Sequence, residues 1–219
     1  MRHLNRLASA AVALAVATTA GFAQAQEASK AVKLFNGKDM TGWTYHLRDK
    51  NAKMEDVWSV KDGVIICKGN PAGYIRTEKS YTNYELRVQW RWAEGKKPGN
   101  SGVLLRMVGE DKVWPKSIEA QLMNQNAGDI WNIEDFPAKV DKSRTKGRRT
   151  AKLEKSSEKP IGEWNQYRIV VHHGKLELYV KDLLQNSATD VEEVAGKICL
   201  QSEGAEIHFR NVELIPHGN

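Results

Sequence analysis

Residues 84–92 have the sequence YELRVQWRW, and this stretch decides the fold. Apolar and polar side chains alternate through all nine positions, and alternate residues of a β-strand face opposite sides of a sheet. The pattern predicts a half-buried strand with Leu86, Val88, Trp90 and Trp92 in the core. An amphipathic helix would instead repeat its apolar residues every three or four positions.

Similar short runs recur along the chain, with little helical pattern between them. They lie at 57–60, 64–67, 102–108, 117–123, 167–172, 176–180, 197–201 and 206–215. Turn-forming residues separate them, and Asp62-Gly63 between two β-branched runs is the strongest hairpin signal. Many short strands with regular turns predict an all-β fold, an antiparallel β-sandwich or jelly roll.

The N-terminus has the three parts of a secretory signal. A basic start is followed by the uncharged run 7–17 and by Ala23-Gln24-Ala25, a small-x-small cleavage site. We expect cleavage after Ala25 and a periplasmic or secreted protein. A membrane anchor is the weaker alternative, because a span needs roughly 20 apolar residues. Residues 26–219 are then long enough for one domain.

Basic residues are concentrated in one segment. The formal net charge is +6, and residues 139–160 contain nine Lys and Arg against three acids. The rest of the chain is therefore neutral, which excludes a basic surface that tracks nucleic acid. We expect residues 139–160 to form a solvated, exposed loop, with a lid or an anionic-surface contact as the alternative.

Cysteine and histidine give only weak signals. Cys67 and Cys199 are the only cysteines, and the sequence does not decide whether they form a disulfide. Both lie in apolar runs, which favour free buried thiols. His172 and His173 are adjacent, so on a strand they would face opposite sides and chelate poorly, and the remaining histidines are scattered. No cofactor is predicted. The sequence leaves open whether carboxylate and carbonyl oxygens bind a divalent cation.

The run 117–123 is the most informative for chemistry. Its alternation places Ile118, Ala120 and Leu122 in the core and leaves Glu119 and Gln121 together on the polar face. Most glycosidases use two carboxylates, so a carboxylate beside an amide argues against that mechanism unless a second acid arrives from another strand. The alternative without a catalytic role is that Glu119 is exposed and pairs with an arginine.

Other polar and aromatic residues could converge on the same surface. Arg106 lies within an apolar run, where a structural buried ion pair is as plausible as a substrate contact. Trp114 and Trp131 lie near turns, where an aromatic face can stack on a sugar, although core packing is the more common use of tryptophan. The further candidates for substrate binding are Asn100, Gln89 and Arg91.

Seven short motifs follow one another in order along the chain. They are the segments 34–43, 58–63, 100–106, 118–121, 162–165, 200–204 and 209–211. Together they resemble the 3-keto-disaccharide hydrolase family, over essentially the whole chain after residue 25. The resemblance implies a jelly roll of the concanavalin A-like lectin and glucanase type, and an enzyme that acts on glycosides already oxidised at C3.

A C3 ketone acidifies the C2 proton, so that one base can start elimination of the anomeric substituent. In this reading Glu119 is the base, and Arg106 or Arg91 stabilises the enolate. Asn100 and Gln121 position the sugar, and water then adds to give net hydrolysis. A non-catalytic carbohydrate-binding module is the main alternative, and a scaffold or adhesion domain is the third.

The chain departs from the family pattern at three places. Gln89 stands where an acid is common, and Lys181-Asp182 replaces an Asn-Gly turn, which removes the residues that a tight hairpin prefers. Glu203 stands where some relatives have histidine after Leu-Gln. Glu203 is therefore a second candidate carboxylate.

Overall fold

Strand β6 spans Tyr84–Trp92, the same residues that the alternating pattern predicts. Leu86, Val88 and Trp90 are fully buried, whereas Arg87 on the other face is exposed. β6 lies in the middle of a large antiparallel sheet, where it pairs with β13 and β17. The strand that the sequence defines most clearly is therefore central to the fold.

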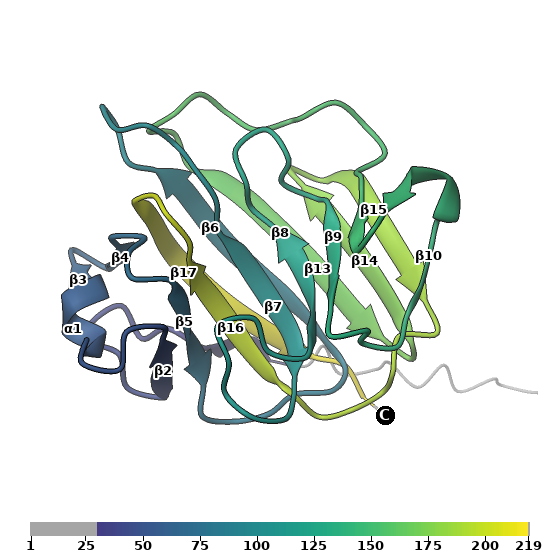
Figure 1. Ribbon diagram of the computed structural model, residues 1–219, viewed down its shortest axis with the longest axis horizontal. Helices are drawn as coiled ribbons and strands as arrows, with labels where there is room; N and C mark the ends of the chain where they lie inside the picture. The colour runs from purple at the N-terminus through teal and green to yellow at the C-terminus, as the bar shows by residue number, and fades with distance from the viewer. Residues whose placement is uncertain (1–29, 219) are drawn as a thin grey trace, which may run out of the picture.

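The structure is a computed structural model that describes residues 30–218, and it consists of two antiparallel sheets (Figure 1). The first sheet has the order β10 (Lys139–Val140), β15 (Leu183–Thr189), β14 (Lys175–Val180), β13 (Asn165–His172), β6, β17 (Ile207–Pro216), β4 (Val64–Cys67) and β3 (Trp58–Lys61), with β1 (Val32–Lys33) paired to β17. The second has the order β11 (Thr145–Lys146), β12 (Arg149–Thr150), β9 (Ile130–Ile133), β8 (Ser117–Gln121), β7 (Gly102–Met107), β16 (Lys197–Ser202), β5 (Gly73–Thr77) and β2 (Trp43–Leu47).

Helix is confined to two short pieces within residues 30–218, α1 (Met54–Val57) and the 3₁₀ turn η1 (Lys142–Arg144). The predicted all-β sandwich is confirmed. No helix among the described residues is long and apolar enough to cross a membrane. The predicted signal sequence lies outside the described residues.

One continuous apolar core joins the facing sides of the two sheets. Leu86 and Trp90 from β6 and Ile169 from β13 belong to the same buried cluster as Val103 from β7 and Ile118 from β8. Each fully buried side chain of this size contributes about 1.5–3 kcal/mol. Cys67 and Cys199 are both buried and free, as their apolar surroundings favoured.

Two tight hairpin turns have similar backbone angles although their residues differ. Asp62 and Gly63 have φ of 50° and 74° between β3 and β4. Lys181 and Asp182 have φ of 52° and 64° between β14 and β15, although neither is glycine or asparagine. The departure at Lys181-Asp182 therefore leaves the hairpin in place, because the pairing of the two long strands outweighs the turn's local preference.

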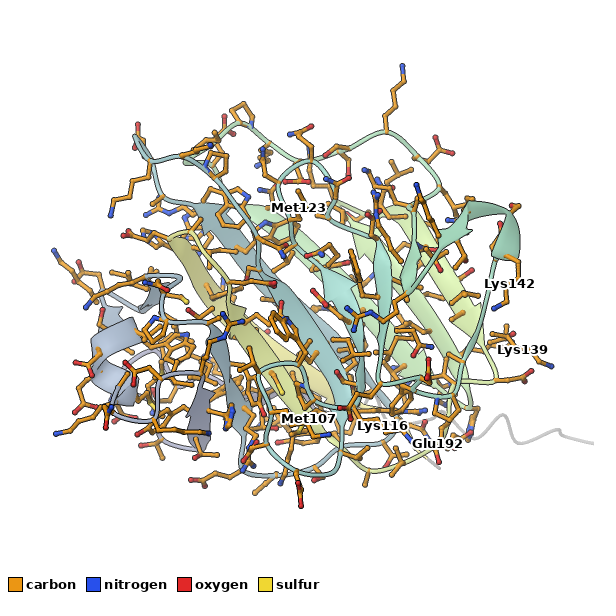
Figure 2. The ribbon with its side chains drawn as sticks, viewed as in Figure 1. Met107, Lys116, Met123, Lys139, Lys142 and Glu192 are labelled. Atoms are coloured by element: carbon orange, nitrogen blue, oxygen red, sulfur yellow. The ribbon has the colours of Figure 1, made fainter. Side chains whose placement is uncertain are left out.

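Residues 139–160 are mostly exposed, as the charge pattern predicts, but they do not form an excursion separate from the sandwich. β10 adds to the first sheet through β15, and β12 adds to the second through β9. Only part of the segment is solvated: Figure 2 shows Lys139 and Lys142 projecting from the edge of the molecule. The segment is therefore a structural part of both sheets.

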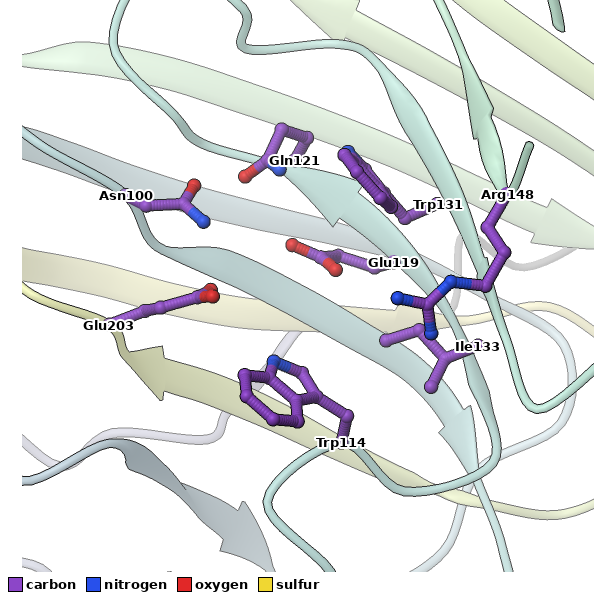
Figure 3. A pocket seen from close by; sticks show the side chains of 8 residues that line it. All are labelled: Asn100, Trp114, Glu119, Gln121, Trp131, Ile133, Arg148 and Glu203. Atoms are coloured by element: carbon purple, nitrogen blue, oxygen red, sulfur yellow. The ribbon is translucent and has the colours of Figure 1, made fainter. Parts of the chain in front are cut away.

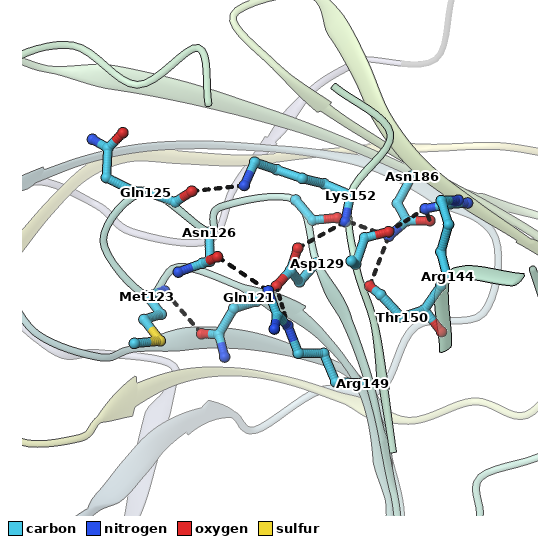
Figure 4. A network of polar contacts seen from close by, with 12 residues as sticks. Gln121, Met123, Gln125, Asn126, Asp129, Arg144, Arg149, Thr150, Lys152 and Asn186 are labelled. Carbon is cyan, nitrogen blue, oxygen red and sulfur yellow. Dashed lines mark hydrogen bonds and ion pairs between the residues drawn. The ribbon is translucent and has the colours of Figure 1, made fainter. Parts of the chain in front are cut away.

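Buried polar contacts anchor the segment. Arg149 Nε donates to Asp129 Oδ2 at 2.6 Å, and the backbone N–H of Lys152 donates to Asp129 Oδ1 (Figure 4). The buried Asn186 side chain donates to the carbonyl oxygens of Gly128 and Thr150. Because polar side chains hold the segment in place, a search for apolar periodicity does not detect it.

Candidate functional site

The site begins on the outward face of β8. Ile118 and Ala120 enter the core, and Glu119 and Gln121 face the other way, as predicted. Glu119 is nevertheless only 4% exposed. Structure outside the two-layer core therefore covers this face of the second sheet.

A pocket of about 190 Å³ opens over this face (Figure 3). Its lining brings together carboxyl, amide, indole and guanidinium groups from six parts of the chain. The lining residues are Asn100, Trp114, Glu119, Gln121, Trp131, Ile133, Arg148 and Glu203. The volume lies below the about 300–1,000 Å³ of pockets for drug-sized ligands, so it suits a ligand about the size of one sugar ring.

One wall comes from the loop 108–116 between β7 and β8. Asp111 in this loop accepts hydrogen bonds from the Tyr74 hydroxyl and from Arg76, both on β5. These contacts hold the loop against the second sheet, and the loop carries Trp114. Trp114 is 43% exposed, and the guanidinium carbon of Arg48 lies 5.1 Å from the centre of its ring.

The opposite wall comes from β9 and the basic hairpin. Trp131 on β9 pairs with Arg149 on β12, and Arg148 lies in the turn that precedes β12. The guanidinium carbon of Arg148 is 5.9 Å from the centre of the Trp131 ring. Two tryptophans, each with an arginine over its ring, therefore flank the pocket.

The surroundings of Glu119 favour its protonated form. Burial is the main cause that raises the pKa of its carboxyl well above the usual range, the negative charge of Glu203 raises it further, and Arg148 lowers it. Burial disfavours the charged form of a carboxyl group. Glu119 is therefore protonated over a wider pH range than an ordinary glutamate.

Glu203 is the second carboxylate of the pocket and is less buried than Glu119. Burial raises the pKa of Glu203, while contacts from the side chains of Asn100 and Trp114 favour its charged form. Asn100 also forms an isolated β-bridge to Glu203, which fixes the two residues side by side. The two carboxyl groups face one space in unequal environments.

Several polar atoms of the pocket have no partner within the described residues. Glu119 Oε1, Asn100 Oδ1 and Trp131 Nε1 are buried and make no hydrogen bond. Most buried polar atoms in proteins are satisfied. Free donors and acceptors around a small pocket can bind a polar ligand or one another.

Six of the residues selected from sequence line this pocket: Asn100, Trp114, Glu119, Gln121, Trp131 and Glu203. Gln121 serves partly as a structural group, because its Oε1 accepts from the backbone N–H groups of Leu122 and Met123. The exposed-glutamate alternative for Glu119 is wrong, since the side chain is buried and forms no ion pair with any described residue.

Arg106 is not part of the site, contrary to the sequence-based hypothesis. It has φ of 50° where β7 and β16 shift register, and this bulge redirects its side chain. The fully buried guanidinium donates to the carbonyl oxygens of Val191, Glu192 and Thr82. Its role is to tie three backbone segments together, without the ion pair that the structural alternative assumed.

Gln89 and Arg91 are also outside the site, because they belong to the first sheet. Arg91 Nε donates to His208 Nδ1, and its guanidinium lies 4.7 Å from the Trp164 ring centre. Gln89 Oε1 accepts from Arg210 Nε at 2.8 Å. Alternation showed correctly that both face away from the core, but it could not show which sheet carried them.

Two pocket residues, Ile133 and Arg148, were not selected from the sequence. Arg148 is the charged one. It was counted only as one of nine basic residues in a solvated segment. Its position beside Trp131 depends on the pairing of β12 with β9, and a two-residue strand leaves no periodic signal.

The histidines also lie differently from expectation. The rings of His172 and His173 lie 4.1 Å apart rather than on opposite faces, because His173 has φ of 43° in the turn after β13. The His217 ring is 4.9 Å from that of His172. Among residues 30–218, however, no group of three His, Cys, Asp or Glu could hold a metal ion.

Comparison with known proteins identifies the family. The profile of the 3-keto-alpha-glucoside-1,2-lyase-like domain matches residues 30–215. The chain belongs to this family. The resemblance found in the seven sequence motifs is thereby confirmed.

Two relatives show how far the sequence has diverged within this fold. The chain is 24% identical to a 3-keto-disaccharide hydrolase of Bacteroides thetaiotaomicron, over 84% of this chain and 77% of the relative. A protein from Parabacteroides distasonis, described as a candidate glycosyl hydrolase, has 22% identity and a TM-score of 0.63, over 86% of this chain and 94% of that one.

The fold is shared with a glucanase. The Bacillus licheniformis β-glucanase superposes with a TM-score of 0.59 at 15% identity, over 88% of this chain and the whole of the other. The glucanase-type jelly roll implied by the family resemblance is therefore confirmed. The protein is therefore a jelly roll of the 3-keto-alpha-glucoside-1,2-lyase-like family.

Proposed function

We propose that this protein cleaves the anomeric bond of glycosides or disaccharides whose C3 carbon is oxidised to a ketone. Family membership supports the substrate class. The observation that carries the proposal is a small pocket in which two carboxyl groups of unequal burial face the same space. Such inequality separates a proton donor from a proton acceptor.

The ketone supplies the driving force for the first step. Loss of the C2 proton leaves an enolate, whose charge is delocalised onto the C3 oxygen. The electron pair then forms the C1–C2 double bond, and the anomeric oxygen leaves C1 with its bonding electrons. An unoxidised sugar has no such path, because its C2 proton is not acidic.

We assign the base to Glu203 and the acid to Glu119. This reverses the expectation from sequence, in which Glu119 was the main base and Glu203 the alternative. Glu119 is the more strongly buried group and faces the charge of Glu203, so it keeps its proton and can donate it to the leaving oxygen. Glu203 is held partly in its charged form by Asn100 and Trp114.

Arg148 takes the enolate-stabilising role that sequence reasoning gave to Arg106 or Arg91. It lines the pocket and forms no ion pair with another described residue, so its charge is available to a developing oxyanion. The Trp114 and Trp131 rings offer flat surfaces for the sugar. Asn100 and Gln121 would position its hydroxyl groups.

Water completes the reaction. It adds to C1 of the unsaturated ketone while the Glu119 carboxylate takes up one of its protons, and Glu203 returns the first proton to C2. The sum is hydrolysis, and both carboxyl groups recover their starting states. Release of the unsaturated sugar before water adds would give a lyase outcome instead.

The test is turnover of a 4-nitrophenyl 3-keto-glycoside and of its unoxidised parent, with and without a chelator. We expect cleavage of the keto compound alone. Loss of activity with the chelator would show that the reaction requires a divalent cation. Cleavage of both compounds at equal rates would contradict the proposal. Binding without turnover would identify a carbohydrate-binding module.

Two variants separate the carboxyl roles. Glu203→Gln should lower turnover about 10²- to 10⁴-fold for every leaving group. Glu119→Gln should have a small effect with 4-nitrophenolate and a large one with a sugar leaving group, which needs protonation. Glu163→Gln, at an exposed position outside the pocket, is the control. Full activity of Glu203→Gln would overturn the base assignment.

Export is proposed separately. A signal cleaved after Ala25 would place the mature chain in the periplasm or outside the cell. N-terminal sequencing of protein from the periplasmic fraction tests this, and a retained Met1 would contradict it.

A further inference from the structure

Two unpartnered oxygen atoms come from the strands on either side of β7 in the second sheet. Glu119 Oε1 and Gln201 Oε1 are both buried, and neither makes a hydrogen bond with any described residue. Gln201 is 2% exposed and lies on β16, two residues before Glu203. Buried acceptors without a donor are rare in folded proteins.

Gly102 brings the two oxygens together. β7 lies between β8, which carries Glu119, and β16, which carries Gln201. A Cβ atom on Gly102 would lie 2.2 Å from Glu119 Oε1 and 2.6 Å from Gln201 Oε1. Both oxygens therefore occupy the space that a side chain at residue 102 would fill.

Two acceptor oxygens in such a space repel each other unless one of them carries a proton. The amide oxygen of Gln201 cannot carry one, whereas the carboxyl group of Glu119 can. A proton on Glu119 Oε1 turns the repulsion into a hydrogen bond and satisfies both atoms.

We propose that Gln201 is a positioning residue whose amide oxygen accepts a hydrogen bond from the protonated carboxyl group of Glu119 above Gly102. The contact helps to keep the Glu119 carboxyl group protonated until the leaving oxygen takes up the proton. Its use in catalysis rests on the proposed function, because that function makes Glu119 the proton donor. The hydrogen bond itself belongs to the free protein.

The orientation of the Gln201 amide fixes the sign of the effect. An amide oxygen facing Glu119 stabilises the neutral carboxyl group and raises its pKa. An amide N–H facing Glu119 would stabilise the carboxylate and lower the pKa. Removing the amide should therefore lower the pKa of Glu119 in the first case and raise it in the second.

The experiment is a pH titration of the Glu119 carboxyl group in the full chain, followed by infrared or carboxyl ¹³C signals. Glu119→Gln assigns the signal by removing it. Gln201→Met keeps the side-chain length and removes the amide, and we expect it to lower the pKa of Glu119 by about one pH unit, since one hydrogen bond contributes about 0.5–1.5 kcal/mol. A rise or no change overturns the proposal.

Two further variants serve as a second replacement of Gln201 and as a control. Gln201→Asn shortens the side chain by one methylene group, and it should give the same direction of change if Gln201→Met does not fold. Gln185→Met replaces another fully buried glutamine, on β15 of the other sheet, and should leave the pKa of Glu119 unchanged.

The alkaline limb of the pH–rate profile is the second readout. Turnover should fall at a lower pH in Gln201→Met, because Glu119 loses its proton earlier. A lowered pKa in a protein without turnover would support the hydrogen bond and reject the proposed function. Turnover in the wild type with an unchanged pKa in the variant would reject only the role of Gln201.

Discussion

The outward faces of β8 and β6 arise from the same alternating pattern but form different surfaces. On β6, Gln89 and Arg91 have their polar groups engaged by Arg210, His208 and the Trp164 ring. On β8, Glu119 is buried and one of its oxygens has no partner. Satisfied polar groups on an open sheet face stabilise that face; a buried group without a donor is available to a ligand or to a neighbouring side chain.

The cause of the difference is what covers each face. The outward face of β8 lies beneath the loop that carries Trp114 and beside the hairpin that carries Arg148. Burial there raises the pKa of Glu119 and concentrates charge in a small space. The chemistry of the protein therefore depends on segments outside the two-layer core.

Arg106→Met should give the largest effect of the changes that test this comparison, and the effect should be on stability alone. The three carbonyl oxygens that Arg106 binds would lose their donors, so the free energy of unfolding should fall by about 3 kcal/mol or more. Urea denaturation measures this, with exposed Arg87→Met as the control. Unchanged stability with lost turnover would return Arg106 to the active site.

Arg148→Met should give the next largest effect, on catalysis. Loss of the cation nearest the developing oxyanion should lower kcat about 10²- to 10³-fold on a 3-keto-glycoside. Stability should change by less than about 0.5 kcal/mol, because the side chain is exposed. Lys146→Met, on the same hairpin, is the control. Equal losses in both variants would indicate a general effect of the hairpin.

Glu119→Gln should stabilise the protein at alkaline pH. The pKa of Glu119 is higher in the folded state than in the unfolded state, so its contribution to stability is present at low pH and is lost as pH rises toward the folded pKa. Gln cannot ionise, so the variant should have the higher Tm at pH 8 and a similar Tm at pH 4. A lower Tm at pH 8 would show that Glu119 is charged in the folded protein.

The smallest effect should come from the β6 face. Gln89→Met and Arg91→Met should leave kcat/KM on a 3-keto-glycoside within about twofold, since neither residue lines the pocket, and should cost about 1 kcal/mol of stability at most. Steady-state kinetics beside Arg148→Met tests the comparison directly. A loss near that of Arg148→Met would mean that substrate contacts both sheets.

The sequence predicted the chemistry-bearing residues where local pattern and fold agree. Glu119 and Gln121 share the outward face of a strand whose neighbours enter the core, and Asn100 and Glu203 lie in motifs of the family. It misplaced Arg106, because a bulge reverses the direction that alternation implies. It missed Arg148, because two-residue strands held by polar side chains carry no periodic signal.

The sequence by itself determined the β-sandwich, since period-two alternation over β6 and its neighbours permits only half-buried strands. It also determined the family, because seven motifs occur in order. The tertiary structure alone decided which outward face became a pocket. Strand order and loop coverage bring Glu119, Glu203 and Arg148 together from distant parts of the chain. The local sequence pattern around each residue does not predict that they become neighbours.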